Sequence, residues 1–179
     1  MRRVDFEGVV VDVFQPPAEF TRINPLGQVP VWVPGDGGGD GNAAIPDSTL
    51  ILRELGLDEG LATDRRVRSV LAVGVMEQTV RHFLESRQAS PDRDTLAECI
   101  DTIAATLTRL EGGGDDGGGV WDLADWDLAI ACQYLDLRLP EKVAGWKWRE
   151  RFPGLARHLS LAMDHPSHGP VFHETAPPA

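Results

Sequence analysis

Two short segments of the chain carry groups that could bind a small polar ligand. The first is Asn24-Pro25-x-Gly27-Gln28-Val29-Pro30, and the second is Asp47-Ser48. The amide of Gln28 can donate a hydrogen bond to a carboxylate, and Asp47-Ser48 opens a predicted helix, where an anion is stabilised. Each segment also has a purely structural interpretation, because Val29-Pro30 could begin an edge strand and Asp47-Ser48 could be only a helix cap. Neither segment decides the matter alone.

The remaining reactive side chains predict no catalytic or metal site. Cys99 and Cys132 lie among apolar residues without a second Cys or a His at metal-ligand spacing, which indicates buried, reduced thiols. The five histidines form no metal motif, so we expect no metal. The single tyrosine, Tyr134, falls within a predicted helix. The five tryptophans are interpreted as core and domain-interface residues.

Composition limits the class of protein. With 179 residues, 42% hydrophobic and 25% charged, the chain can bury a core as one domain or two small ones. A net charge of -11 opposes nucleic-acid binding. Basic residues cluster only at Arg65, Arg66 and Arg68 and around residues 147–151, and we expect both clusters to be solvated helix faces. No apolar run is long enough for a membrane span and no signal peptide is recognised, so a cytoplasmic protein without membrane contact is predicted.

The ligand-binding segments belong to a short α/β half, residues 1–56. Strands are predicted at residues 4–14, at 29–33 and, briefly, at 43–45, with one helical turn in 18–24. Asp47 or Ser48 should cap a helix that ends at Gly56. Residues 57–64 are short and polar and are predicted to be a linker.

The rest of the chain, residues 65–179, is predicted to be helical. Helices are expected over 65–88, from Pro91 to about 111, from Asp122 onward and around 154–164. The second has an apolar stripe at steps of three and four residues, namely Leu96, Ile100, Ile103, Leu107 and Leu110. Asp122 can cap the third helix with Asp125 in its first turn, a structural role.

Taken in order, these segments resemble the glutathione transferase superfamily. The matching elements are Asn24-Pro25-x-Gly27-Gln28-Val29-Pro30, then Asp47-Ser48, the capping-box helix at 122–138 and the closing segment at 152–172. The family has Ser or Thr where Asp122 stands, and Asp is an adequate cap. The resemblance implies a thioredoxin-like N-terminal domain, incomplete here, followed by an all-α C-terminal domain.

The resemblance also implies a glutathione site. In the family the bond before Pro30 is cis, and the backbone of Val29 pairs with the peptide-like ligand as an added strand would. Gln28 would meet the glycyl carboxylate, Ser48 the γ-glutamyl carboxylate and Asp47 the glutamyl ammonium. Glutathione would be a co-substrate, attacking or isomerising a small hydrophobic electrophile held by the helices at 65–88 and 92–111. A homodimer is expected.

The family's thiol-activating Tyr, Ser or Cys lies between the first strand and the first helix. Residues 4–14 correspond to the second strand, so this segment is expected to be missing from the sequence. Three explanations remain open: a start chosen at an internal methionine, a shift of residues 4–14 into the vacant central place, or a sheet completed by a partner chain. We favour the first explanation. The chain is therefore expected to be a transferase-type enzyme or, alternatively, a non-catalytic binding or assembly module of the same fold.

Overall fold

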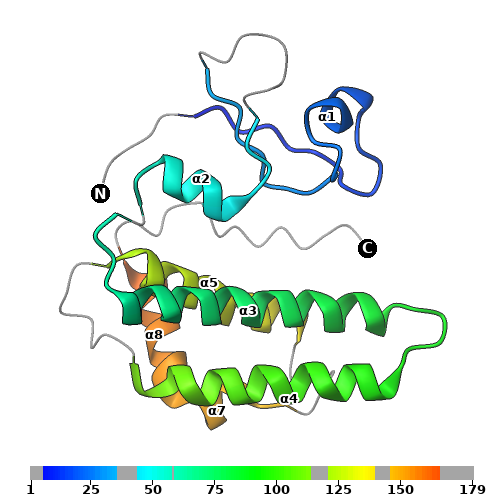
Figure 1. Cartoon of the computed structure of the whole chain (residues 1–179). Coiled ribbons are helices and arrows are strands. Elements are labelled where there is room, and N and C mark those ends of the chain that lie inside the picture. Colours follow the sequence, from blue (N-terminus) through cyan, green and yellow to red (C-terminus); the bar gives the residue numbers. More distant parts are fainter. Residues whose placement is uncertain (1–5, 36–43, 58, 114–120, 140–145, 166–179) are drawn as a thin grey trace. The chain divides into compact units, whose positions relative to one another are not determined.

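The computed structural model describes residues 6–35, 44–57, 59–113, 121–139 and 146–165, which form two compact units (Figure 1). The first unit is Met1–Glu59 and the second is Gly60–Ala179. In the described residues, no helix is both long enough and apolar enough to span a bilayer.

The first unit contains two short helices, α1 (Ala18–Ile23) and α2 (Ser48–Glu54). Asp47 is the N-cap of α2, and its side chain accepts a hydrogen bond from the amide of Leu50 at 2.8 Å. After the C-cap, Gly56 has a φ of 69°, a left-handed conformation that glycine adopts without strain. The predicted helix start and stop are therefore confirmed.

The predicted strands are not formed in the described residues of this unit. Residues 6–14 contain no strand, and the region of residues 29–33 and 44–45 contributes one isolated antiparallel pair, Trp32 with Ile45. A strand needs the N–H and C=O groups of a neighbour, and no described segment pairs with residues 6–14. Their apolar side chains are consequently exposed, Phe6 by 82% and Val10 by 99%. The expected α/β sheet is thus absent from the described part of this unit.

The described residues of the second unit are mostly helical, as predicted. Its elements are α3 (Thr63–Ser86), α4 (Arg93–Leu110), the 3-10 turn η1 (Glu111–Gly113), α5 (Leu123–Arg138), α7 (Trp148–Arg151) and α8 (Pro153–Asp164). Helix α3 packs against both α4 and α5, and α8 packs against α5 (Figure 1). The core between these helices includes Val75, Ile103, Leu107, Leu128, Leu135, Leu155 and Trp148.

The stripe predicted on α4 faces this core. Ile103, Leu107 and Leu110 are buried, and Leu96 and Ile100 are half-buried. The N-terminus of α4 differs from the prediction, because Pro91 precedes the helix rather than occupying its first turn. Asp92 is the N-cap, and its carboxylate accepts from the amide of Asp94 at 3.0 Å.

Candidate functional site

The segment after α1 is held by one buried amide side chain. Asn24 is fully buried, and its Nδ2 donates to the carbonyl of Gln28 at 2.6 Å while its Oδ1 accepts from the amide of Leu26 at 3.1 Å. Gly27, inside this turn, has a φ of 66°, which suits glycine. The Val29–Pro30 peptide bond is cis. Asn24 therefore fixes the backbone that presents Gln28 and Val29.

One antiparallel pair relates this segment to the start of α2. The amide of Trp32 donates to the carbonyl of Ile45 at 3.0 Å, and the amide of Ile45 donates to the carbonyl of Trp32 at 2.8 Å. In an antiparallel register, moving back along one strand corresponds to moving forward along the other. Pro30 lies two residues before Trp32, and Asp47 lies two residues after Ile45. Both predicted binding segments therefore leave the same end of the pair.

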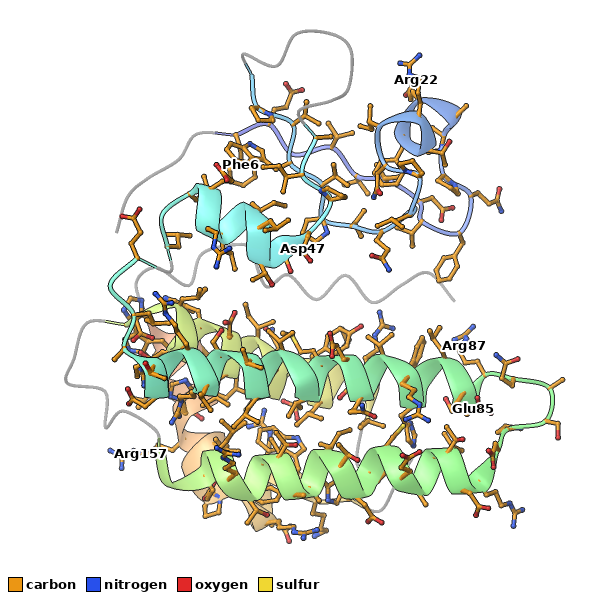
Figure 2. All side chains as sticks on the ribbon, viewed as in Figure 1. Phe6, Arg22, Asp47, Glu85, Arg87 and Arg157 are labelled. Carbon is orange, nitrogen blue, oxygen red and sulfur yellow. The ribbon has the colours of Figure 1, made fainter. Side chains whose placement is uncertain are left out.

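All five predicted glutathione contacts are exposed. Gln28, Pro30, Asp47 and Ser48 belong to the exposed class, and Val29 is 54% exposed. Figure 2 shows Asp47 at the start of α2. The first amides of a helix have no hydrogen-bond partner within the helix, and of these amides the Asp47 side chain accepts a hydrogen bond only from that of Leu50. The surface therefore offers an amide side chain, a carboxylate, a hydroxyl and helix-start amides.

The described part of the first unit offers few groups that could activate a thiol. Thr21 lies on α1, and its hydroxyl donates to the carbonyl of Ala18 at 3.0 Å. Cys99 and Cys132 belong to the second unit, where both are buried and unbridged. Burial raises the pKa of both thiols, that of Cys132 to about 12. Tyr134 also belongs to the second unit, on α5.

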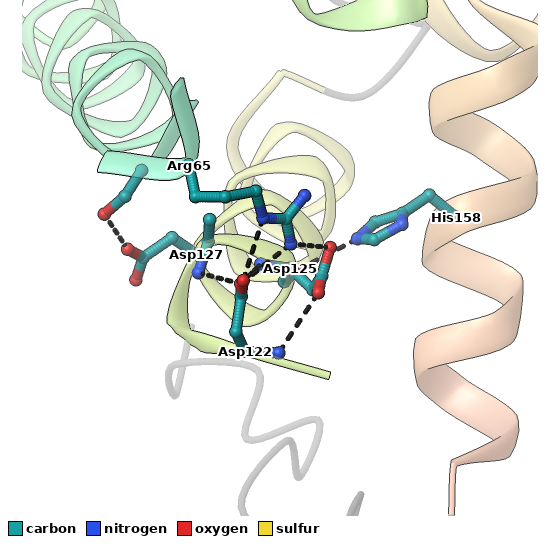
Figure 3. Close-up of polar contacts among 7 residues, drawn as sticks. Arg65, Asp122, Asp125, Asp127 and His158 are labelled. Carbon is teal, nitrogen blue, oxygen red and sulfur yellow. Dashed lines mark hydrogen bonds and ion pairs between the residues drawn. The ribbon is translucent and has the colours of Figure 1, made fainter. Parts of the chain in front are cut away.

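The second unit contains a polar cluster at the start of α5, shown in Figure 3. Asp122 is the N-cap, with Oδ1 accepting from the amides of Ala124 at 2.8 Å and Asp125 at 3.2 Å. Asp125 Oδ2 in turn accepts from the amide of Asp122 at 3.1 Å, which completes a capping box. Arg65 of α3 donates to both Asp122 oxygens at 2.8 Å and lies 2.6 Å from Asp125 Oδ1.

The surroundings of this cluster set its charge states. Burial would raise the pKa of Asp122, but the hydrogen bonds from Arg65 and from backbone amides outweigh it and lower that pKa. His158 of α8 donates from Nε2 to the carbonyl of Asp125 at 2.9 Å and stacks on Trp121. Burial lowers the pKa of His158, a shift only partly opposed by that hydrogen bond. The neutral imidazole is therefore favoured.

Sequence reasoning missed the contacts that Arg65 makes in this cluster. Arg65, Arg66 and Arg68 were expected on a solvated face, but Arg65 is ion-paired and Arg68 is 7% exposed, so the expectation was wrong for both. The partner carboxylates lie on another helix, with Asp122 57 residues from Arg65, and no local pattern could have revealed them. The cluster connects α3, α5 and α8 through the contacts of Arg65 and His158 with Asp125. In the described residues, no three His, Cys, Asp or Glu side chains gather as they would around a metal ion.

Two family models match the chain, in the order of the two units. The model described as glutathione S-transferase, N-terminal domain, matches residues 1–57. The model described as glutathione S-transferase, C-terminal domain, matches residues 93–160. No curated protein matches the chain.

Several crystal structures are similar to the chain over most of its length. A glutathione S-transferase from Methylobacillus flagellatus with glutathione bound has a TM-score of 0.78 and 24% identity, covering 92% of this chain and 85% of that one. One from Methylobacterium radiotolerans, in complex with glutathione sulfonate, has a TM-score of 0.72 and 26% identity, covering 88% and 77%. A glutathione transferase family member from Pseudomonas fluorescens with bound glutathione has a TM-score of 0.71 and 24% identity, covering 90% and 82%. The chain has the fold of these proteins.

Proposed function

The chain belongs to the glutathione S-transferase superfamily, and from that premise we propose that its first unit binds glutathione. The contacts proposed are Gln28, Val29, Pro30, Asp47 and Ser48. The observation that carries the proposal is the antiparallel pair of Trp32 with Ile45. The segment with Gln28, Val29 and Pro30 and the segment with Asp47 and Ser48 both leave the same end of this pair, and both are exposed. The structural neighbours that hold glutathione support the same ligand. A thioredoxin-like arrangement of this unit is part of the proposal, supported by the family model over residues 1–57.

Each end of the tripeptide has a suitable partner in this arrangement. The amide of Gln28 would donate to the glycyl carboxylate, and the backbone of Val29 would pair with the peptide of the ligand. Ser48 and the first amides of α2 would donate to the γ-glutamyl carboxylate. Asp47 would accept from the glutamyl ammonium while it continues to cap the helix.

The proposed reaction is the attack of the glutathione thiolate on a small hydrophobic electrophile, or a glutathione-dependent isomerisation. Binding the two reactants together supplies proximity, and a hydrogen bond to the sulfur favours the thiolate. In this proposal the electrophile is held by the helices of the second unit and the protein acts as a homodimer.

The second candidate function is a non-catalytic module that binds glutathione without turnover. It is favoured by the sequence of the first unit, residues 1–59, which contains neither a cysteine nor a tyrosine to activate the thiol. Retention on immobilised glutathione together with turnover of a chlorodinitrobenzene substrate supports the enzyme. Retention without turnover supports the module, and no retention contradicts both.

Asp47→Asn is the sharpest test of the binding site. Asparagine caps helices as well as aspartate, so the variant keeps α2 but loses the charge facing the ammonium. We expect the Kd for glutathione, measured by calorimetry, to rise about tenfold, as the loss of one charge-assisted hydrogen bond predicts. Glu54→Gln, which removes a charge at the other end of α2, should leave the Kd unchanged. Equal affinities for Asp47→Asn and Glu54→Gln would remove Asp47 from the site.

A further inference from the structure

Residues 6–14 of the first unit form an apolar segment whose backbone groups have no strand partner among the described residues. No residue of this segment has a positive φ, and none belongs to a helix or a bridge (Figure 1). In the described part of the chain, its backbone makes one hydrogen bond, from the amide of Phe14 to Asp12 Oδ1 at 2.9 Å. The N–H and C=O groups before this turn are therefore available to pair with another strand.

The side chains of the 6–14 segment are as open as its backbone. Four apolar side chains are at least 78% exposed, namely Phe6, Val9, Val10 and Phe14. Figure 2 marks Phe6 at the start of the segment. Val11 is half-buried. Contiguous exposed apolar surface of this kind is typical of a surface that contacts another protein.

The order of the apolar residues is symmetric about Val10. Valines stand one residue before and after it, and phenylalanines stand four residues before and after it. In antiparallel pairing, one strand runs backwards along the other. When Val10 lies opposite Val10 of a second copy, Val9 lies opposite Val11 of that copy. Phe6 then lies at the same end of the pairing as Phe14 of the second copy.

The acidic residues of the segment fit this register. Asp12 lies opposite Gly8 of the second copy, and Glu7 lies opposite position 13, which is a valine. No two carboxylates are therefore opposed. Parallel pairing in register would place Glu7 against Glu7 and Asp12 against Asp12, and like charges directly opposite each other destabilise a sheet. The segment is thus complementary to a second copy of itself in the antiparallel direction.

We propose that two copies of the chain join through the 6–14 segment as an antiparallel ribbon with a two-fold axis at Val10. A two-fold interface uses the same surface of both copies and closes at the dimer. It supplies the strand partner that the described residues of one chain lack. The inference rests on the homodimer of the proposed function and adds the surface that joins its copies, and it does not depend on glutathione.

Disulfide cross-linking of the full chain tests the register. In Val10→Cys the two new thiols lie opposite each other, so mild oxidation should give a covalent dimer on a non-reducing gel. Both native cysteines are buried and should not react. Val70→Cys is the matched control, at a valine of α3 that is 69% exposed, and it should give no covalent dimer.

Sedimentation velocity measures the assembly itself. The wild type should be a dimer at micromolar concentration. Added salt should strengthen this dimer, because it screens the repulsion between two chains that each carry a net charge of -11. Val10→Asp places two carboxylates opposite each other and should raise the dissociation constant of the dimer at least about tenfold. Val70→Asp should leave that constant unchanged. Thermal unfolding checks that each variant folds, and Val10, which is 99% exposed, makes little contact within one chain.

The inference is overturned if the wild type sediments as a monomer or as an open series of larger species. It is also overturned if Val10→Cys gives no covalent dimer, or if Val70→Asp separates the copies and Val10→Asp does not. Retention on immobilised glutathione is measured separately. A monomeric wild type that is retained overturns this inference alone, whereas a dimeric wild type that is not retained contradicts only the glutathione site.

Discussion

Arg65→Met should destabilise the second unit more than any exposed ion pair would predict. The substitution keeps most of the side chain but leaves Asp125, whose side chain is 2% exposed, without its ion-pair partner. Removing one member of a buried pair costs about 3–5 kcal/mol. The side chains of Arg65 and Asp122 keep exposures of 23% and 32%, so water screens part of the loss. We therefore expect the free energy of unfolding to fall by about 2–3 kcal/mol.

Urea denaturation followed by tryptophan fluorescence measures this loss, because four of the five tryptophans belong to the second unit. The melting temperature should fall by about 5–10 °C for a chain of this size. Arg81→Met is the matched control, since Arg81 is also on α3 and pairs with Glu98 of α4 at 3.2 Å. Those side chains are 48% and 63% exposed, so the control should lose less than about 1 kcal/mol.

The same variants have a defined pH dependence. The folded-state pKa of Asp122 is lowered, so its stabilising contribution is present above its unfolded pKa and is lost as pH falls through the lower folded value. The difference in the free energy of unfolding between the wild type and Arg65→Met should accordingly become smaller at acidic pH. The reasoning is refuted if Arg65→Met and Arg81→Met lose equal stability at neutral pH.

Three further perturbations test other contacts of the second unit. Because burial lowers the pKa of His158, stability should fall as pH drops below about 6.5, where unfolded histidine gains its proton, by up to about 1.4 kcal/mol per pH unit. In urea titrations, the stability of His158→Phe should depend less steeply on pH, and the dependence that is left belongs to His82, which is also buried and has a lowered pKa. Gly154→Ala should lower the free energy of unfolding by about 1–3 kcal/mol, because the new Cβ would lie 3.0 Å from the carbonyl oxygen of Glu111. Gly74→Ala, in α3, should raise it by about 0.5–1 kcal/mol, because a Cβ there meets no atom within 4 Å. Melting temperatures of the two variants that shift in the same direction would contradict this prediction. Cys132, buried and with its pKa raised to about 12, should react with a thiol reagent at pH 8 only after denaturant is added.

Features that depend on neighbours along the chain were predictable from the sequence. The stripe on α4 follows from apolar residues spaced by three and four, and Ile103 and Leu107 are buried as that spacing requires. Asp47 caps α2 because its side chain reaches an amide three residues on. Gly56 ends the same helix because it tolerates a positive φ. Each of these interactions closes within one helical turn.

The strands were not predictable in the same way. The Val-rich composition of residues 6–14 satisfies every local preference for a strand, yet the described chain supplies no partner for their backbone groups. A helix satisfies its hydrogen bonds internally, whereas a strand depends on a segment that can lie anywhere in the sequence. Composition therefore indicated the type of segment without establishing its pairing.

By itself, the sequence determined the order of the long helices, the caps at Asp47 and Asp122, the family and the residues proposed to bind glutathione, because these depend on residue type and short spacing. Only the tertiary structure decided which charges meet. Arg65 donates to Asp122, which is 57 residues away in the sequence, and Arg138 of α5 lies over the ring of Phe83 of α3. The physical reason is that burial and ion pairing depend on distances through space, which are set when the apolar faces of the helices pack together.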